Sequence, residues 1–529
     1  MNLSLLLLVP ILILIITPLI MLIIRILQPD FTFFWLIAAL GALATWPAVL
    51  LLRLRIPESI TLVTWKPEQI LPVSPTLLLD SISWPFAMAL ATLVLAVILT
   101  DVTRVPDVNW SAWASSLAIS AISMLAVFAG NPLTLILAWG AIDLIELIIL
   151  LSPALESADR ERIVILFATR TAGIVLLIAA GMAARSNGEI LTFTNISPQV
   201  SVYLLLACGL RLGVVPLHQP FLGDMPLRRG LGTLLRMAPT AASLVLLTRT
   251  AAAGVSSSLT PYILGFAGLA AIYASVSWVS ADDELSGRPF WILGGAALSI
   301  AAAAREQPTA SLAWGIATLL SGGLLFLLTA RHRLLRIFIF LGLLGFTALP
   351  FTAAWDGVNL YAAPVTPILA VFIFSEALLL IGYARYAMQT GPSLIGVERW
   401  VWLIYPWGLA LLPLSHYIIT YLGRTGTTNQ DFSFPSLMAS WPGLLTLGIA
   451  GAAVIWMRRG GRFHPRVVRA IRSGFSLNWL YRLLWGLYGS LGRLVAFVNL
   501  ILEGEGGILW ALLILTLLFS LLAQSGLGG

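Results

Sequence analysis

Apolar runs of about 20 residues recur along almost the whole chain, and this pattern limits the possible folds more than any other feature. A run of this length fits an α-helix that crosses a bilayer core of about 30 Å, whereas the strands of a membrane barrel have about 10 residues of alternating polarity. The composition agrees, because 59% of the residues are hydrophobic and 10% are charged, against about 25% charged residues in soluble domains. The sequence therefore predicts an all-α polytopic membrane protein.

We expect about sixteen transmembrane helices, one for each apolar run. The runs cover residues 3–24, 31–52, 82–100, 111–130, 132–151, 163–184, 199–217, 231–250, 261–281, 290–304, 309–330, 337–355, 364–384, 400–422, 437–457 and 507–524. The first run has no basic segment before it and no small-residue cleavage site after it, which favours a retained span over a signal peptide. Arginines concentrate in the loops after odd-numbered spans. The positive-inside rule then places these loops in the cytoplasm and both termini outside.

The loop before the last span, residues 458–506, has a pattern of its own. It opens with a polybasic stretch that suits anionic lipid headgroups. Apolar residues then recur every three or four positions, as they do on one face of a helix. We expect a cytoplasmic amphipathic helix that lies along the membrane and faces lipids or neighbouring subunits; a surface helix without a protein partner is the alternative. The residues that define it are Arg466, Arg469, Arg472, Leu480, Leu484, Leu487, Leu491 and Leu494.

Ionisable residues inside the predicted spans are the candidate functional residues, because a charge in the membrane is costly unless it is paired or hydrated. Arg211 lies within the run 199–217, and the prolines that follow it predict a broken helix. Pro350 predicts a second break, in the run 337–355. Carboxylates beside arginines suit a partial proton path, and structural ion pairs between helices are the alternative. The proton-path candidates are Asp143, Glu146, Arg211, His218, Arg236 and Glu376, and Arg170 and His416 are the other buried ionisable residues.

The chain lacks the residues that hold electron carriers. Cys208 is the only cysteine, which excludes a disulfide within the chain and any site built from several cysteines. No P-loop, GxGxxG, GxSxG or HExxH motif is present. We therefore expect no cofactor, no metal and no nucleic-acid partner for this chain.

One acidic run leaves a function of another class open. Asp282, Asp283 and Glu284 could bind a divalent metal for a lipid-linked transfer reaction, as in a stand-alone membrane transferase, or serve a solute carrier. A solvated helix end is the other interpretation of such a run.

Three segments carry a resemblance to a known family. LLLDSIS at 77–83 is similar to the family's L-D-G-L-S before the third span, AGNPLTLILAWG at 129–140 to D-N-L-L-x-x-F-x-W-E, and GLRLGVVPLHQPFLGDM at 209–225 to G-K-S-A-Q-x-P-L-H-x-W-L-P-D-A-M. Together with the number of spans and the helix before the last span, they make the chain resemble the antiporter-like membrane subunits of respiratory complex I. Mrp-type cation/proton antiporters and membrane-bound hydrogenases contain subunits of the same family.

The resemblance implies two inverted five-helix repeats, formed by spans four to eight and nine to thirteen. It also implies a proton-translocating subunit of a complex I-type NADH:quinone oxidoreductase or a related redox-driven pump in a bacterial inner membrane. Its partners would be other membrane-arm subunits and, through them, the redox subunits; an Mrp-type antiporter or a hydrogenase subunit is the alternative. The expected parts are N-terminal spans (1–110), a first half (111–250), a degenerate second half (251–390), C-terminal spans (391–457), the lateral helix (458–506) and the last span (507–529).

The departures from the family affect the residues that should carry protons. The family pairs a glutamate after the tryptophan of the fifth span with a lysine of the broken seventh span, and these positions are Gly140 and Arg211 here. Asp143 follows one helical turn later and could restore the carboxylate. Arginine, however, keeps its proton at any biological pH.

The second half departs further. The lysines expected in the eleventh and twelfth spans align with Gly322 and Gly357, and Lys66 is the only lysine in the chain. We therefore expect proton conduction to be weakened or lost, and a structural or coupling role to be retained.

Overall fold

The computed structural model divides the chain into two compact units, Met1–His464 and Pro465–Gly529. It describes residues 3–63, 73–103, 109–151, 157–219, 229–255, 258–330, 332, 335–362, 364–389, 398–423, 440–459, 486, 489–490, 492–493, 496–497 and 512–516. The residues chosen to define the lateral helix, Arg466 to Leu494, lie outside this set, and so does most of the last predicted span.

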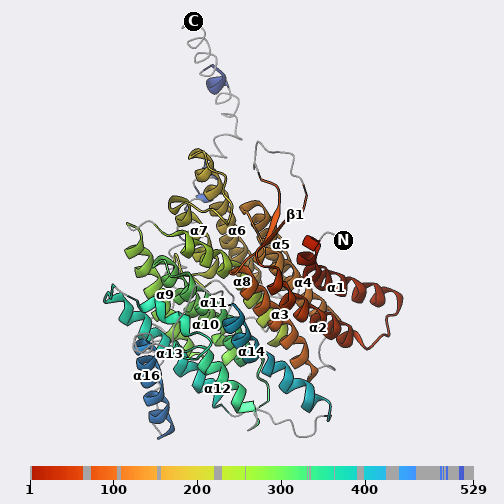
Figure 1. Ribbon diagram of the computed structural model, residues 1–529. Helices are drawn as coiled ribbons and strands as arrows, with labels where there is room; N and C mark the ends of the chain where they lie inside the picture. Colours follow the sequence, from red (N-terminus) through yellow and green to blue (C-terminus); the bar gives the residue numbers. More distant parts are fainter. Residues whose placement is uncertain are drawn as a thin grey trace. The chain divides into compact units, whose positions relative to one another are not determined.

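The described part of the first unit is almost entirely helical (Figure 1). Its helices are η1 (Leu3–Leu8), α1 (Val9–Leu27), α2 (Phe34–Leu52), η2 (Arg53–Arg55), α3 (Ser83–Thr100), α4 (Trp110–Val127), α5 (Pro132–Leu151), α6 (Ser157–Ser186), α7 (Pro198–Leu212), α8 (Arg229–Ala253), α9 (Thr260–Ser280), α10 (Glu284–Ala304), α11 (Pro308–Leu327), α12 (Arg336–Gly345), η5 (Trp355–Tyr361), α13 (Ile368–Ala387), α14 (Val401–Gly423) and α16 (Trp441–Arg458). Eleven helices among the described residues are long and apolar enough to cross a membrane. The protein is therefore an integral, polytopic membrane protein.

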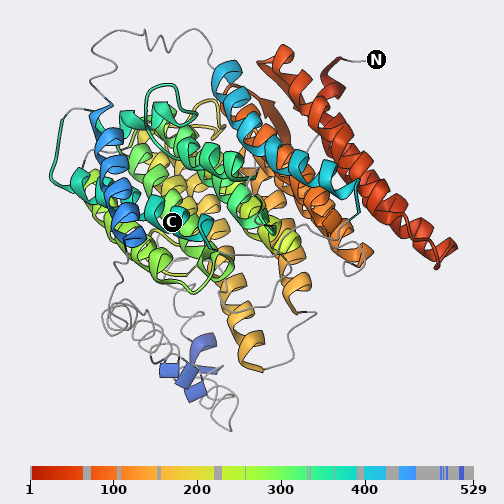
Figure 2. The same ribbon diagram turned by 90° about the horizontal axis from the view of Figure 1, so that it is seen from below.

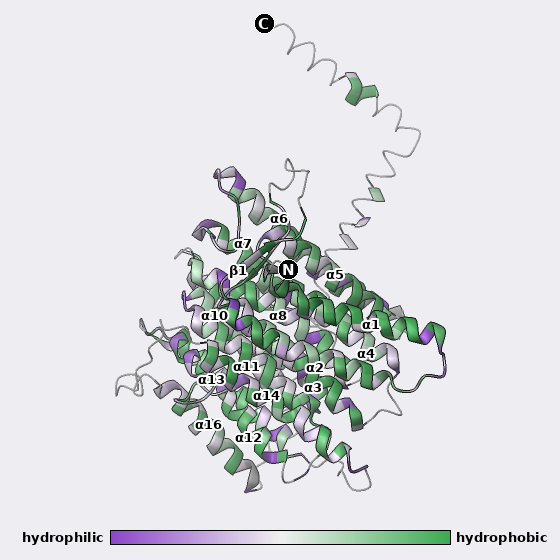
Figure 3. Cartoon of the chain, turned by 45° about the vertical axis from the view of Figure 1, so that its right-hand side comes forward, coloured by the Kyte–Doolittle hydropathy of each residue, from purple (hydrophilic) through white to green (hydrophobic). Residues whose placement is uncertain are grey.

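The helices α3, α8, α10 and α11 form the centre of the first unit, because most of their residues are buried. In α1 and in α6, by contrast, only 33% of the most apolar stretch of 18 residues is buried. The helix α8 packs against α3, α4, α7, α10 and α11, and its many Gly, Ala, Ser and Thr residues allow this close approach. The outer helices α1 and α16 lie at opposite edges of the unit (Figure 2). Large apolar residues of α1, such as Leu12, Ile16 and Leu19, are exposed, as expected for a surface that faces lipid. Most of α1 has the hydrophobic colour in Figure 3.

A short hairpin departs from the all-helical expectation. Strands β1 (Glu58–Thr61) and β2 (Thr76–Leu79) pair antiparallel, with Glu58 opposite Leu79. Leu78 donates its backbone N–H to the carbonyl of Phe128 at 2.6 Å, so β2 also joins the end of α4. The hairpin thereby fixes the segment LLLDSIS beside the start of α5.

Two predicted spans are interrupted. The helix α7 ends at Leu212, where Gly213 has a φ of +78°, and the chain then turns before His218. The run 337–355 is not one helix, because α12 ends at Gly345 and turns lead into η5. Pro350 explains part of this difference, because it cannot donate the N–H that a continuing helix needs. The interruptions fall in the fourth helix of α4–α8 and the fourth of α9–α13.

Candidate functional site

The first half brings Asp143 and Arg211 together in a buried ion pair. Asp143 lies in the middle of α5, and Arg211 lies one residue before the end of α7. Both terminal nitrogens of Arg211 donate to the two carboxylate oxygens of Asp143, at 2.7 Å each. The side chains are 2% and 1% exposed. Such a bidentate pair is strong and fixes the orientation of both groups.

A second pair adjoins the first. Arg170 on α6 donates to the Glu146 carboxylate and lies 3.8 Å from Asp143. The backbone carbonyl of Arg170 also accepts a hydrogen bond from Arg211 at 3.1 Å. Two carboxylates and two guanidinium groups from three helices thus form one neutral group, which we call the four-charge cluster (Asp143, Glu146, Arg170 and Arg211).

Aromatic and apolar groups leave little space around the four-charge cluster. The guanidinium carbon of Arg211 lies 4.4 Å from the centre of the Trp139 ring, a distance that stabilises a desolvated cation. A cavity of about 10 Å³ adjoins Asp143, Glu146 and Arg170, and its other walls are leucine, isoleucine and phenylalanine side chains. This volume is close to the minimum for one water molecule. This cavity therefore offers room for about one water molecule beside the four-charge cluster.

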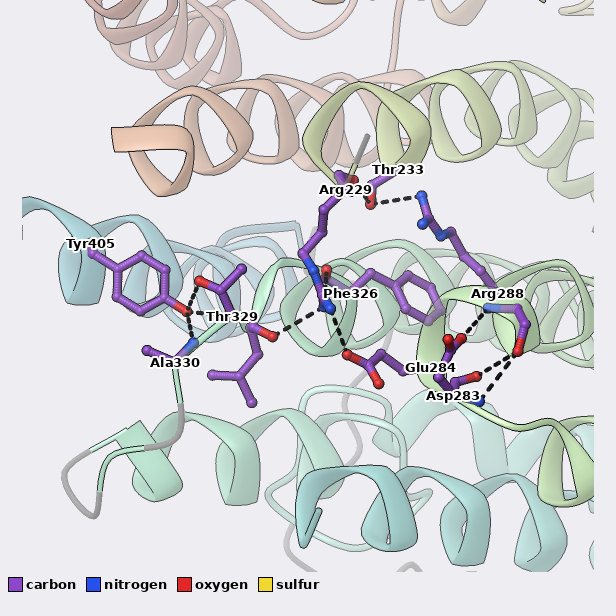
Figure 4. A network of polar contacts seen from close by, with 11 residues as sticks. Arg229, Thr233, Asp283, Glu284, Arg288, Phe326, Thr329, Ala330 and Tyr405 are labelled. Atoms are coloured by element: carbon purple, nitrogen blue, oxygen red, sulfur yellow. Dashed lines mark hydrogen bonds and ion pairs between the residues drawn. The ribbon is translucent and has the colours of Figure 1, made fainter. Parts of the chain in front are cut away.

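A line of buried arginines leads from the four-charge cluster toward the second half. Arg236 on α8 is buried, and Arg288 on α10 is 1% exposed. Arg288 donates to the Thr233 hydroxyl at 3.1 Å (Figure 4). Positive charge thus continues across the middle of the unit.

Arg288 was missed as an intramembrane residue, because the run 290–304 begins after it. The helix α10 starts earlier, at Glu284, since the Asp283 carboxylate accepts from the Ser286 backbone N–H at 2.6 Å and caps the helix. The spacing Asp-x-x-Ser is the sequence signal that could have placed this start.

The acidic run at 282–284 serves this helix end. Besides the Asp283 cap, Glu284 accepts from Arg229 at 2.8 Å, and Arg229 also donates to the Phe326 and Leu328 carbonyls at the end of α11 (Figure 4). Among the described residues, no three His, Cys, Asp or Glu side chains gather as metal ligands would. Two of the three carboxylates on which the transferase alternative depends thus have structural partners.

Arg249 is another buried arginine. It lies near the end of α8 and is 3% exposed. Its guanidinium lies 3.3 Å from the Asp80 carboxylate, within LLLDSIS, and donates to the Ala129 carbonyl at 3.2 Å. Asp80 also accepts from the backbone N–H of Ser83 at 2.7 Å and so helps to start α3. This pair ties two of the family-like segments to α8.

Tryptophan rings occupy the space beside Gly322 and Gly357, the second-half positions that align with family lysines. A Cβ atom added to Gly322 would lie 2.7 Å from Cδ1 of Trp291 and 2.9 Å from Cε of Met237. One added to Gly357 would lie 2.9 Å from Cε2 of Trp314. Real Cβ atoms essentially never approach other atoms below 3.0 Å. No lysine fits either position without displacing an indole ring.

These tryptophans belong to a larger buried group. Trp291 lies 4.4 Å from Phe346 and 5.5 Å from Trp278, between ring centres, and Trp314 lies 5.4 Å from Phe346. Each ring in this group is fully buried or nearly so. We call the group the tryptophan cluster; its members are Trp278, Trp291, Trp314, Phe326, Phe346, Tyr383 and Tyr386.

The remaining candidates do not join the four-charge cluster. Glu376 on α13 is fully buried and accepts from the Tyr361 hydroxyl at 2.7 Å and the Thr446 hydroxyl at 3.2 Å. His416 on α14 is 2% exposed, and its Nε2 has no hydrogen-bond partner among the described residues. His218 lies beyond α7, where its Nδ1 is 2.9 Å from the Pro216 carbonyl oxygen.

This protein resembles known proteins in structure but not detectably in sequence. The sequence matches no protein-family model and no curated relative. A chain of the membrane-bound sulfane sulfur reductase, an archaeal respiratory membrane complex, superposes with a TM-score of 0.70 at 15% identity, over 97% of this chain and 99% of that one. This chain therefore shares its fold with a chain of a respiratory membrane complex. The resemblance seen in the sequence is confirmed at this level.

Two further complexes contain similar chains. One chain of the Mrp complex from Dietzia sp. gives a TM-score of 0.71 at 16% identity, over 99% of this chain but 63% of that longer one. One chain of respiratory complex I from Thermus thermophilus gives 0.58 at 14% identity, over 78% and 96%. All three neighbours come from multi-subunit membrane complexes.

Proposed function

We propose that this chain is a membrane-arm subunit of a multi-subunit, ion-coupled respiratory complex, in which it serves assembly and coupling and does not translocate protons through its second half. It lies in a bacterial cytoplasmic membrane with both termini outside. Its partners are other antiporter-like subunits and, through them, redox subunits that hold the electron carriers. Residues 458–506 run along the cytoplasmic surface of these neighbours as a brace.

The observation that carries this proposal is the tryptophan cluster at the positions of the missing lysines. A proton path through a membrane needs titratable groups linked by water. The second half has glycines at Gly322 and Gly357, and indole rings occupy the space beside both. Large buried aromatic groups exclude water and cannot accept protons at physiological pH.

The four-charge cluster supports the same proposal for the first half. A lysine that alternately binds and releases a proton can carry it, whereas Arg211 and Arg170 keep theirs. Each carboxylate has a guanidinium partner, and the adjoining cavity has room for about one water molecule. The cluster therefore holds α5, α6 and α7 together and presents a fixed charge pattern to α8.

The positions of the two interruptions favour two inverted repeats. The broken helices α7 and α12 are the fourth members of consecutive sets of five, α4–α8 and α9–α13. Paired interrupted helices in corresponding halves are typical of repeat-built transporters. We infer that the ancestral site lay between these halves and that the tryptophan cluster now fills its second part.

Purification of the native complex tests this proposal. An affinity tag on the chain, in mild detergent, should retrieve other large hydrophobic subunits together with flavin- or iron–sulfur-containing proteins. Retrieval of hydrophobic subunits without redox proteins would instead favour the Mrp-type alternative, whose fold this chain shares. Retrieval of the chain alone, with metal-dependent transferase activity, would contradict the proposal.

A further inference from the structure

A groove between α12, α13 and α16 has the dimensions of a ligand site. Its volume is about 620 Å³, within the range of about 300–1,000 Å³ that is usual for small-molecule pockets. It exists because α12 has ten residues and so extends only about 15 Å along its axis, about half the thickness of the bilayer core. Small residues on its walls, such as Ala384 and Ala450, keep it open. Gly451 contributes as well, since a Cβ atom there would meet nothing within 4 Å.

The two ends of the groove differ in chemistry. Arg336, His332 and Gln389 line one end. Mostly apolar side chains line the rest, among them Leu343 on α12 and Leu380 on α13. Arg336 and Leu343 are separated by about 10 Å along α12. The groove is therefore amphipathic along its length.

The helix α12 starts at the basic end of the groove. Arg336 is the first residue of α12, and no described side chain caps this helix. The positive end of the helix dipole favours an anion at this point. His332 packs edge-on against Trp402, with 5.2 Å between ring centres, and so borders this end. The positive charge of Arg336 and the direction of α12 both favour an anionic group at this end of the groove.

The orientation of the groove matches one leaflet of the membrane. The start of α12, the end of α13 and the end of α16 lie on the same side, because consecutive spans alternate in direction. Arginines concentrate on this side, which places it at the cytoplasmic surface. A lipid of the cytoplasmic leaflet has its phosphate at this level and its acyl chains toward the bilayer centre. Exposed Phe340 and Met388 at the rim place the groove at the surface of the unit.

We propose that this groove binds one anionic phospholipid, with the phosphate at Arg336 and the first turn of α12 and an acyl chain between α12, α13 and α16. Basic pockets between transmembrane helices on the cytoplasmic side are known to hold such headgroups. The bound lipid completes the wall that the short α12 leaves open. This site does not depend on whether the chain conducts protons.

Photocrosslinking tests the site in the purified native complex. The complex is incorporated into nanodiscs that contain either phosphatidylglycerol or phosphatidylcholine with a diazirine on the acyl chain, at equal mole fraction. Labelled peptides are then identified by mass spectrometry. We expect labels on α12, α13 and α16 from phosphatidylglycerol, and about fivefold fewer when Arg336→Gln removes one charge near the headgroup. Arg160→Gln, at an exposed arginine on α6, is the matched control and should leave the labelling unchanged.

A pair of glycine variants separates this groove from the general lipid surface. Gly451→Leu fills the groove and should abolish the labels within it. Gly448→Leu, on the same helix but outside the groove, also adds a side chain into open space and should retain them. Equal labelling by the two lipids, or equal labelling of the two glycine variants, would overturn the proposal. So would displacement of the label by an uncharged quinone analogue but not by unlabelled phosphatidylglycerol.

Discussion

Arg211 differs from the lysine of the family in a property that decides transport, because its guanidinium does not release a proton. The sequence predicted both the arginine at this position and its partner Asp143, which follows Gly140 by one helical turn. It did not reach the pairing of Arg170 with Glu146, because nothing in the sequence fixes the rotation of α6 against α5. Individual charges could therefore be named, but only the structure groups them into the four-charge cluster.

The buried pair leads to a prediction about stability. Asp143→Leu leaves Arg211 buried without its bidentate partner, and we expect the free energy of unfolding to fall by about 3–5 kcal/mol. Removing both charges with Asp143→Leu and Arg211→Met should cost about 1–2 kcal/mol at most, because a buried ion pair is often replaceable by apolar groups. Thermal unfolding in mild detergent measures both variants.

The stability of the double variant relative to the single variant tests whether the two charges compensate each other. A double variant that is as unstable as the single variant would show that the two charges do not compensate each other. The four-charge cluster would then not be the structural unit described here.

At the scale of helices, the apolar runs predicted the positions of most elements, and the ends of the helices were less predictable. The run 290–304 starts too late because the first turns of α10 contain Glu284, Ser286 and Arg288, which an apolar run excludes. In the run 337–355 the predicted position of the break was wrong, because α12 ends at Gly345, five residues before Pro350. The tryptophan cluster could not be predicted at all, because Trp291 and Gly322 lie on different helices and their contact depends on how α10 packs against α11.

Two glycines that align with family charges provide a test of helix packing. Gly140→Ala should stabilise α5 by up to about 1 kcal/mol, because alanine favours a helix and a Cβ atom there would meet nothing within 4 Å. Gly322→Ala should destabilise the protein by about 1–3 kcal/mol, because the added atom meets Trp291. Thermal unfolding of the two variants measures the contrast. Equal effects would mean that Trp291 does not occupy the position of the missing lysine side chain.

The acidic run provides another test at the scale of a helix. Asp283→Ala removes the cap of α10 and should lower the free energy of unfolding by about 0.5–2 kcal/mol. Asp282→Ala, at the neighbouring exposed carboxylate, should have a smaller effect. A metal site would show the opposite pattern, with both variants losing the same metal-dependent activity and neither losing stability.

At the scale of the whole molecule, the two halves differ in their buried side chains. The first half has an ionic cluster, with Arg211 at the position that aligns with a family lysine. The second half has the short helix α12, and tryptophan rings lie beside Gly322 and Gly357. The membrane class, the broken helices and the family resemblance could all be predicted from the sequence, because hydrophobicity and proline positions are local. The filling of the second half by the tryptophan cluster depends on long-range packing and could not be predicted from the sequence.

The most direct test measures proton translocation by the intact complex in proteoliposomes. The number of protons moved per electron pair is compared between the wild-type complex and one whose subunit carries both Asp143→Leu and Arg211→Met, after assembly has been verified. We predict the same stoichiometry in both complexes, because the four-charge cluster is structural and the second half is closed. A lower stoichiometry in an assembled variant complex would contradict this account and would assign a proton path to this subunit.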